Sequence, residues 1–342
     1  MSTRAFITGV SGPELTAEER AFIRAERPWG FILFKRNVAT PAQVAALVGE
    51  LRDAAGAPDA PVLIDQEGGR VQRLGPPHWP VYPPGAVFSS LYDTDSALGL
   101  TAARLSARLI AADLFDLGIT VDCLPLADVP VAGADAVIGN RAYGTEPGKV
   151  AAIARAVTDG LEQGGVLPVL KHIPGHGRAT ADTHFKLPTV DTARDELMRT
   201  DFAAFKPLSD LPMAMTAHVV FSAVDPAHPA TTSATMIEQV IRGVIGFQGL
   251  LMSDDVSMNA LAGTLAERTG AIVSAGCDMV LHCNGNIDEM RDVVSQTPEL
   301  TGKALERANR ALAARNAPLP LDRGSARTEL DALIARANTA TA

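Results

Sequence analysis

Short apolar runs recur along the chain, and each has the length of a β-strand. They are continuously hydrophobic and lack an alternating polar face, as is typical of strands that are buried on both sides. The eight runs are Ala5–Gly9, Gly30–Phe34, Pro61–Asp65, Ile119–Asp128, Val166–Lys171, Met213–His218, Leu250–Asp255 and Asp278–Asn284. We interpret them as the strands of a sheet that is covered on both faces.

Helical patterns fill the stretches between these runs. In Pro41–Gly56 and Asp93–Gly118 the apolar residues are spaced three and four positions apart, both segments end at glycine, and the second begins with aspartates suited to capping. Strands that alternate with helices indicate a parallel α/β sheet with crossover connections. Eight such units predict a single (β/α)8 barrel of the TIM type. No glycine-rich dinucleotide loop follows the first run, which disfavours an open nucleotide-binding sheet.

The domain organisation follows from the same pattern. We expect one catalytic domain over residues 1–342, with the barrel in about 1–299 and a helical C-terminal extension in about 300–342. No change in composition marks a second domain.

Composition and charge favour a cytoplasmic enzyme. The net charge is −9 and the basic residues are scattered, which argues against nucleic acid or an anionic membrane as a partner. The N-terminal apolar run is too short for a signal peptide, and no run approaches the length of a membrane span. Cys123, Cys277 and Cys283 are odd in number and lie in apolar runs, which indicates buried free thiols in a reducing compartment. The low aromatic content favours a monomer.

Polar residues close most of the apolar runs. In a barrel these positions converge on one rim, where such enzymes hold their active sites. The residues are Asp65, Asp122, Asp128, Lys171, His172, His218, Asp254, Asp255 and Asn284. For the Asp254–Asp255 pair we expect one catalytic carboxylate and one cap of the following segment.

The loop after the fifth run, "KHIPGHGRATADTH" (Lys171–His184), holds three of the seven histidines. Asp182 and His184 are two positions apart, so in an extended segment their side chains lie on the same side. A carboxylate that holds a histidine fixes its tautomer and tunes its basicity, which suits a general acid/base. A local turn without a chemical role is the alternative.

A metal site is a competing interpretation of the same loop, because imidazole and carboxylate groups bind divalent metals. However, no H-x-H pair ends the first run, and most of the ligands would come from a single loop. The set would be His172, His176, Asp182 and His184, completed by Asp254 or His218. We expect no metal and no cofactor.

Four motifs, in order, resemble those of the family 3 glycoside hydrolases, and more narrowly the bacterial single-domain β-N-acetylglucosaminidases of the NagZ type. The resemblance covers the chain from the first run to about Asn284. The motifs are "LIDQEGGRVQRL" (Leu63–Leu74), "IGNRAYG" (Ile138–Gly144), "KHIPGHGRATADTH" and "LLMSDDVSM" (Leu250–Met258).

This resemblance implies a retaining, two-step exo-hydrolysis of terminal β-linked N-acetylglucosamine, with Asp254 as nucleophile and a His184–Asp182 pair as acid/base. The subgroup usually has serine between that pair, where this chain has Thr183. The substrate would be a carbohydrate, namely muropeptides that carry N-acetylglucosamine and are recycled from the cell wall. The positions that would bind the sugar are Asp65, Arg73, Arg141, Lys171 and His172.

Three other functions remain open at this point. A phosphorylase would use phosphate in place of water in the second step and would release a sugar 1-phosphate. A metal-dependent barrel hydrolase would lose its activity with a chelator. A sugar-binding protein without activity would bind the sugar and not turn it over.

Overall fold

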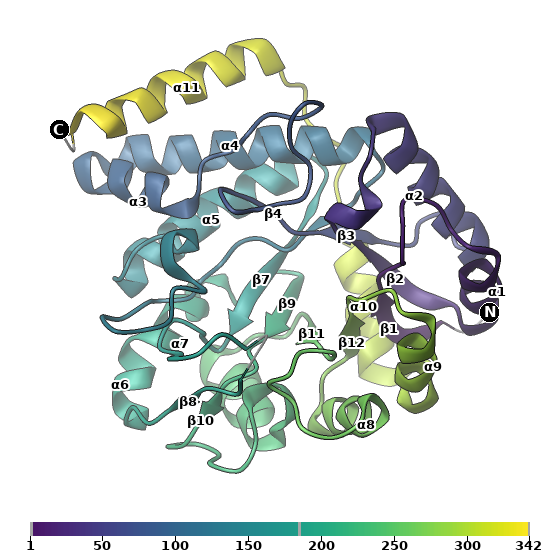
Figure 1. Ribbon diagram of the computed structural model, residues 1–342. Coiled ribbons are helices and arrows are strands. Elements are labelled where there is room, and N and C mark those ends of the chain that lie inside the picture. Colours follow the sequence, from purple (N-terminus) through teal and green to yellow (C-terminus); the bar gives the residue numbers. More distant parts are fainter. Residues whose placement is uncertain (1–2, 184–185, 341–342) are drawn as a thin grey trace.

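The structure is a computed structural model that describes residues 3–183 and 186–340. Eight parallel strands form a closed barrel in the order β1-β12-β11-β9-β7-β6-β3-β2, and helices surround it (Figure 1). The predicted barrel is confirmed, and each predicted run overlaps one of its strands. These are β1 (Arg4–Thr8), β2 (Pro28–Leu33), β3 (Val62–Ile64), β6 (Val121–Asp122), β7 (Leu167–Ile173), β9 (Met213–Thr216), β11 (Leu250–Asp255) and β12 (Met279–His282).

The outer layer consists of the helices that follow these strands. Local capping explains several of their ends: Thr16 and Glu19 form a capping box at the start of the first helix, and Gly56 ends the second in a left-handed conformation. The helices are α1 (Ala17–Glu26), α2 (Pro41–Ala55), α3 (Gly85–Thr94), α4 (Ser96–Asp116), α5 (Pro147–Gln163), α6 (Arg194–Arg199), α7 (Asp201–Phe205), η5 (Met236–Ile245), α8 (Leu265–Ala275) and α9 (Ile287–Gln296).

The predicted helix over Asp93–Gly118 is wrong in its extent, because two helices meet there. Asp95 ends α3 in an extended conformation, and its side chain accepts hydrogen bonds from the first amides of α4. The aspartate thus does cap a helix, but one that begins at Ser96.

Short elements at the loops were not predicted. Two small sheets pair β4 (Gln66–Gly68) with β5 (Val71–Gln72) and β8 (Thr189–Val190) with β10 (Val220–Phe221). Single turns of 3-10 helix are η1 (Lys35–Asn37), η2 (Gly139–Arg141), η3 (Lys206–Leu208) and η4 (Ala230–Thr232).

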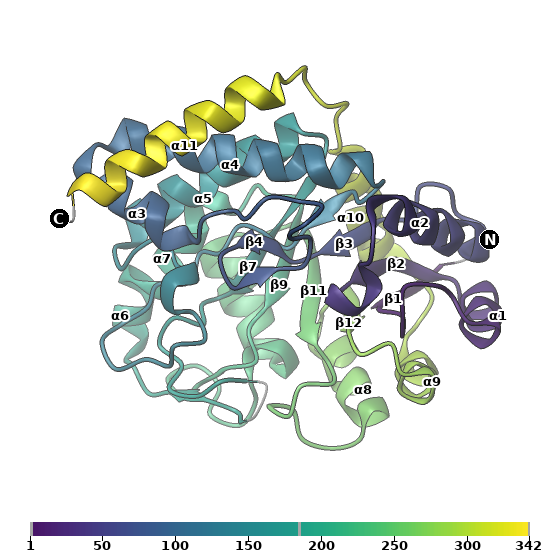
Figure 2. The ribbon, with the colours of Figure 1, turned by 45° about the horizontal axis from the view of Figure 1, so that its top comes forward.

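Two C-terminal helices follow the barrel. Ala308 and Ala311 of α10 (Gly302–Ala313) pack against the residues that fill the barrel interior, so this helix covers the N-terminal end of the barrel. Figure 2 shows α11 (Arg323–Ala340) lying along α4 and α3. Among the described residues, no helix has both the length and the apolar character needed to cross a bilayer.

Alternate residues of each barrel strand belong to different clusters, which explains the continuous apolar runs. In β11, Leu250 and Met252 pack in the barrel interior, whereas Leu251 packs in the larger cluster beneath the helices. The strands β7, β9 and β12 alternate in the same way. Both faces of the sheet are therefore apolar, as in other buried parallel sheets.

Candidate active site

A cavity of about 330 Å³ opens at the C-terminal ends of the barrel strands. The predicted site residues Asp65, Arg73, Arg141, Lys171, His172, Asp182 and Asp254 all line it. His184 lies outside the described residues. The floor is formed by Ile32, Met215 and Leu281, which belong to β2, β9 and β12.

The strand alternation explains why three of these residues point into the cavity. Asp65, Lys171 and Asp254 each lie two residues after an inward-facing apolar residue, namely Leu63, Val169 and Met252. Because side chains two apart on a strand share a face, the polar residue continues the interior column at its upper end. The positions that face inward in the core therefore determine which residues at the strand ends face the cavity.

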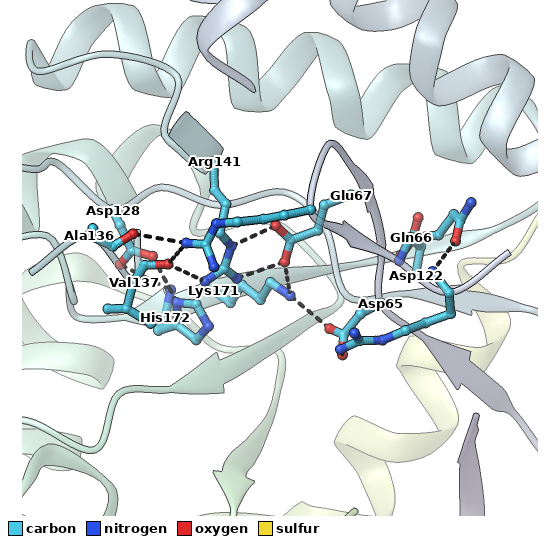
Figure 3. A network of polar contacts seen from close by, with 12 residues as sticks. Asp65, Gln66, Glu67, Asp122, Asp128, Ala136, Val137, Arg141, Lys171 and His172 are labelled. Atoms are coloured by element: carbon cyan, nitrogen blue, oxygen red, sulfur yellow. Dashed lines mark hydrogen bonds and ion pairs between the residues drawn. The ribbon is translucent and has the colours of Figure 1, made fainter. Parts of the chain in front are cut away.

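Four charged residues that line the cavity (Asp65, Arg73, Arg141 and Lys171) and Glu67 behind them form a single network (Figure 3). The Lys171 ammonium lies 2.9 Å from Asp65 Oδ1 and 2.7 Å from Glu67 Oε1. Arg141 donates to both Glu67 oxygens, from Nε at 2.8 Å and from Nη2 at 2.7 Å. Arg73 donates to Asp65 Oδ2 at 2.9 Å and lies over the ring of Phe34. The network contains three cations and two carboxylates, all with fixed partners.

The network keeps both carboxylates ionised. Burial alone would raise the pKa of Glu67, but Arg141 and Lys171 outweigh burial and lower this pKa from 4.5 to about 2. Asp65 is likewise buried, and Lys171 and Arg73 hold its pKa well below the usual range. Conversely, the pKa of Lys171 is raised: burial would lower it, but Asp65 and Glu67 more than compensate.

These shifts predict a loss of stability in acid. A carboxylate whose pKa is depressed by folding stabilises the folded state above its unfolded pKa, and this contribution disappears as the pH falls through the folded pKa. For Glu67 the window runs from about pH 4.5 down to about pH 2, and the contribution is on the order of 3 kcal/mol.

In urea titrations between pH 7 and pH 3, the free energy of unfolding of the natural chain should therefore fall. The Glu67→Gln variant should start lower at pH 7 and fall less steeply. A constant difference between the two proteins across this range would contradict the prediction.

Asp128 organises the start of the loop after β7. Its Oδ2 lies 2.8 Å from Nδ1 of His172, and its Oδ1 accepts the main-chain amides of His172 at 3.3 Å and His176 at 2.7 Å. Asp128 is fully buried, yet its pKa is lowered, because His172 and His176 outweigh the effect of burial. An ionised Asp128 orients His172 by accepting its Nδ1–H, so that the other ring nitrogen is directed away from this contact.

His176 lies beside His172 at the cavity, with the two rings in an edge-to-face arrangement and their centroids 5.7 Å apart. Burial and the neighbouring His172 lower the pKa of His176 to about 4, so its ring is neutral near pH 7. Its main chain stabilises the loop through Asp128.

Asp254 and Asp255 have different environments. The half-buried Asp254 lines the cavity, and its Oδ1 accepts the amide of Asp255 at 2.8 Å. Burial opposes ionisation of Asp254, but the nearby His218 and His172 outweigh it and lower the pKa. Asp255 is held locally: it accepts from the amide and hydroxyl of Ser257 and from the amide of Cys283. Asp255 therefore holds the turn after β11 and does not cap a helix, because the next helix, α8, begins only at Leu265 with Thr264 as its cap. The catalytic role expected for Asp254 stays a prediction.

The segment that carries Asp182 is fixed from several sides. Main-chain bonds join Val131 N to Gly177 O and Asp135 N to Ala179 O, and thus connect the loops after β6 and β7. A Cβ on Gly177 would lie 2.2 Å from the carbonyl of Val129, so glycine is needed there for close packing rather than for a hinge. Asp182 lines the cavity, but its predicted pairing with His184 lies outside the described residues.

Two histidines of the alternative metal set have hydrogen-bond partners that fix their rings. Asp128 holds Nδ1 of His172, and both ring nitrogens of His218 are bonded, to Thr231 Oγ1 at 2.7 Å and to the carbonyl of Asp255 at 2.9 Å. Within residues 3–183 and 186–340, no three His, Cys, Asp or Glu side chains are placed to hold one metal ion.

Sequence reasoning missed part of the site and misplaced some polar residues. Glu67 was not among the predicted site residues, but it contacts both Arg141 and Lys171. Its position two residues after Asp65 was the available signal. Asp122 is fully buried beneath the rim, where it accepts the amide of Gln66.

The cysteines are free, as expected, but only two of the three are buried. Cys123 and Cys277 are buried in the core. Cys283 is half-buried and lines the cavity, because it follows β12 at the mouth of the barrel.

The sequence was compared with known protein families and with known proteins. The model of the "Glycosyl hydrolase family 3 N terminal domain" matches residues 7–313. A beta-hexosaminidase of Alkalilimnicola ehrlichii is 39% identical over 280 residues, which are 81% of this chain and 79% of the relative. A beta-hexosaminidase of Methylococcus capsulatus is 36% identical over 330 residues, 95% of this chain and 93% of the relative.

Among solved structures, NagZ from Neisseria gonorrhoeae in complex with N-trifluoroacetyl-D-glucosamine superposes with a TM-score of 0.84. It is 31% identical, and the match covers 98% of this chain and 97% of that one. The chain therefore belongs to glycosyl hydrolase family 3.

Proposed function

We propose that the protein is a retaining exo-β-N-acetylglucosaminidase, a β-N-acetylhexosaminidase that hydrolyses terminal β-linked N-acetylglucosamine. Family membership and the beta-hexosaminidase relatives support this activity. The observation that carries it is the ionised carboxylate of Asp254, which lines a cavity together with a dense array of charged hydrogen-bonding groups. Such an array suits the many hydroxyls of a sugar.

In the first step, an Asp254 oxygen attacks the anomeric carbon while the bond from that carbon to the leaving oxygen breaks. His184, protonated and paired with Asp182, gives its proton to the leaving oxygen, and a glycosyl-Asp254 ester forms. In the second step the neutral His184 takes a proton from water, the hydroxide oxygen attacks the anomeric carbon, and Asp254 is released as a carboxylate. Two displacements leave the β configuration unchanged.

The sugar would be held by Asp65, Arg73, Arg141, Lys171 and His172. The fixed contacts between these residues support the proposal, because a group held by a partner can bind a hydroxyl without a further loss of side-chain freedom. Asp128 would orient His172 for this task.

We further propose a biological setting. The substrate would be muropeptides that carry N-acetylglucosamine, cleaved in the cytoplasm during recycling of the cell wall by a monomer whose barrel and C-terminal helices act as one catalytic unit. The NagZ likeness supports this setting.

The first test is release of the aryl alcohol from an aryl N-acetyl-β-glucosaminide, with and without EDTA and with added phosphate. We expect hydrolysis to free N-acetylglucosamine, unchanged by the chelator. A loss of activity with EDTA would favour the metal site. Formation of a sugar 1-phosphate at the expense of free sugar would favour a phosphorylase.

A further inference from the structure

Glu67 lies behind the cavity and not in it. Its side chain is almost fully buried, with the residue 8% exposed. Arg141 and Lys171 line the cavity, whereas Glu67 is not among the described lining residues. A change at Glu67 therefore reaches a ligand through these two cations.

The carboxylate of Glu67 fixes both cations at once. Arg141 binds it with two parallel hydrogen bonds, which set the plane of the guanidinium group as well as its position. The oxygen Oε1 also accepts from Lys171 Nζ at 2.7 Å. Arginine and lysine side chains have several rotatable bonds, so a shared acceptor removes most of their conformational freedom.

Glu67 also balances the charge of the wall. With Glu67 ionised, the network carries three positive and two negative charges. Without it, Asp65 would be the only carboxylate of the network facing three cations, and Arg141 and Lys171 would repel each other in a buried place.

Arg70 lies in the same β4–β5 hairpin as Glu67. It holds the loop after β6, which carries Arg141, through contacts that do not involve Glu67. Arg70, in the turn between β4 and β5, donates to the carbonyl of Ala136 at 2.9 Å and to that of Val137. Arg141 itself donates to the carbonyl of Val137. Because these bonds reach main-chain atoms of the loop, the loop should keep its place when the Glu67 carboxylate is removed.

We propose that Glu67 is a positioning residue that sets the affinity for the sugar by holding Arg141 and Lys171 in their binding geometry. The proposal rests on the sugar-binding roles proposed above for these two residues. Glu67 would act on the binding of the sugar more than on the chemical step, because it contacts neither Asp254 nor the loop that carries Asp182 among the interactions described.

The chain offers a matched control in Asp278. This carboxylate is also buried, at 6% exposure, and also holds two cations, Arg242 at 2.9 Å and Arg307 at 2.8 Å. It precedes β12 and so lies at the end of the barrel opposite the cavity. Asp278→Asn should lower stability as Glu67→Gln does, with no effect on sugar binding.

The measurement is the Kd for N-acetylglucosamine by calorimetry, together with kcat and KM for the aryl glycoside, for Glu67→Gln, Glu67→Ala and Asp278→Asn. We expect Kd and KM to rise about ten- to hundredfold in both Glu67 variants, with kcat changed less. Formate should partly restore the affinity of Glu67→Ala, whose missing carboxylate leaves room for it, and should not restore that of Glu67→Gln. Unchanged Kd in the Glu67 variants, or an equal rise in Asp278→Asn, would overturn the proposal.

Lys171→Met separates this proposal from the one on which it rests. A weaker Kd in Lys171→Met with an unchanged Kd in Glu67→Gln would reject the role of Glu67 alone. An unchanged Kd in Lys171→Met would reject the sugar-binding role of Lys171 and the proposal for Glu67 with it.

Discussion

Replacing Asp254 by asparagine is expected to reduce turnover of an aryl N-acetyl-β-glucosaminide by about 10⁴-fold or more, and to leave the fold intact. Asparagine keeps the shape of the side chain but cannot form the glycosyl ester, so the first step loses its nucleophile. The side chain is half-buried and accepts a hydrogen bond from the amide of Asp255, which the side-chain oxygen of asparagine can accept equally well. Steady-state kinetics and circular dichroism measure the two effects.

The neighbouring Asp255→Asn is the control for this experiment. It carries the same chemical change one residue away, but Asp255 is engaged by Ser257 and Cys283. We expect it to lower stability and to keep turnover within about tenfold of the natural chain. If Asp255→Asn were the inactive variant and Asp254→Asn the active one, the two roles would have to be exchanged.

The pH profile gives a further test of Asp254. Because the pKa of this carboxyl is lowered by His218 and His172 against the effect of burial, the nucleophile is ionised throughout the neutral range. If protonation of Asp254 causes kcat/KM to fall in acid, the midpoint of that fall should therefore lie below 3.8, the ordinary pKa of an aspartate.

The second large effect is expected for His184→Ala, which should slow hydrolysis roughly 10²- to 10⁴-fold, as is typical when general acid/base help is lost. The loss should depend on the leaving group. A 4-nitrophenyl group departs with little protonation, so its first step should suffer less than that of an alkyl or sugar aglycone. Comparison of kcat/KM for the two kinds of glycoside measures the difference.

Asp182→Asn should repeat this pattern more weakly, because it leaves the imidazole in place but removes its partner. His228→Ala is the matched control, since His228 is exposed and pairs with Asp225 away from the cavity. Equal losses for both leaving groups in His184→Ala would contradict an acid role in the first step.

The fold could be predicted from the sequence because burial on both faces of the sheet leaves continuous apolar runs. Each of the eight runs overlaps a barrel strand, and Leu250–Asp255 coincides with β11. The two-residue strands β5, β8 and β10 could not be predicted, because they lie outside the apolar runs and are too short to show a period of their own. The join at Asp95 was missed because the helical pattern continues across it, and only the capping geometry separates α3 from α4.

Site residues could be predicted where the alternation along a strand determines which side chains face inward. Asp65, Lys171 and Asp254 lie near the carboxyl ends of strands, and the alternation of the core directs them inward. The partners of Arg141 were beyond prediction, because Arg141 lies on a long loop whose path depends on tertiary contacts. Glu67 and Arg141 are far apart in sequence, and no local pattern links a carboxylate to a distant guanidinium.

The main-chain bonds between the loops after β6 and β7 have a consequence for attempts to re-engineer this enzyme. Gly177 packs against the backbone of Val129, and Val131 and Asp135 bind the carbonyls of the same loop. Neither loop can be exchanged for a longer or shorter version without displacing the other. To introduce loops from a relative with a different substrate selectivity, both loops would have to be exchanged together.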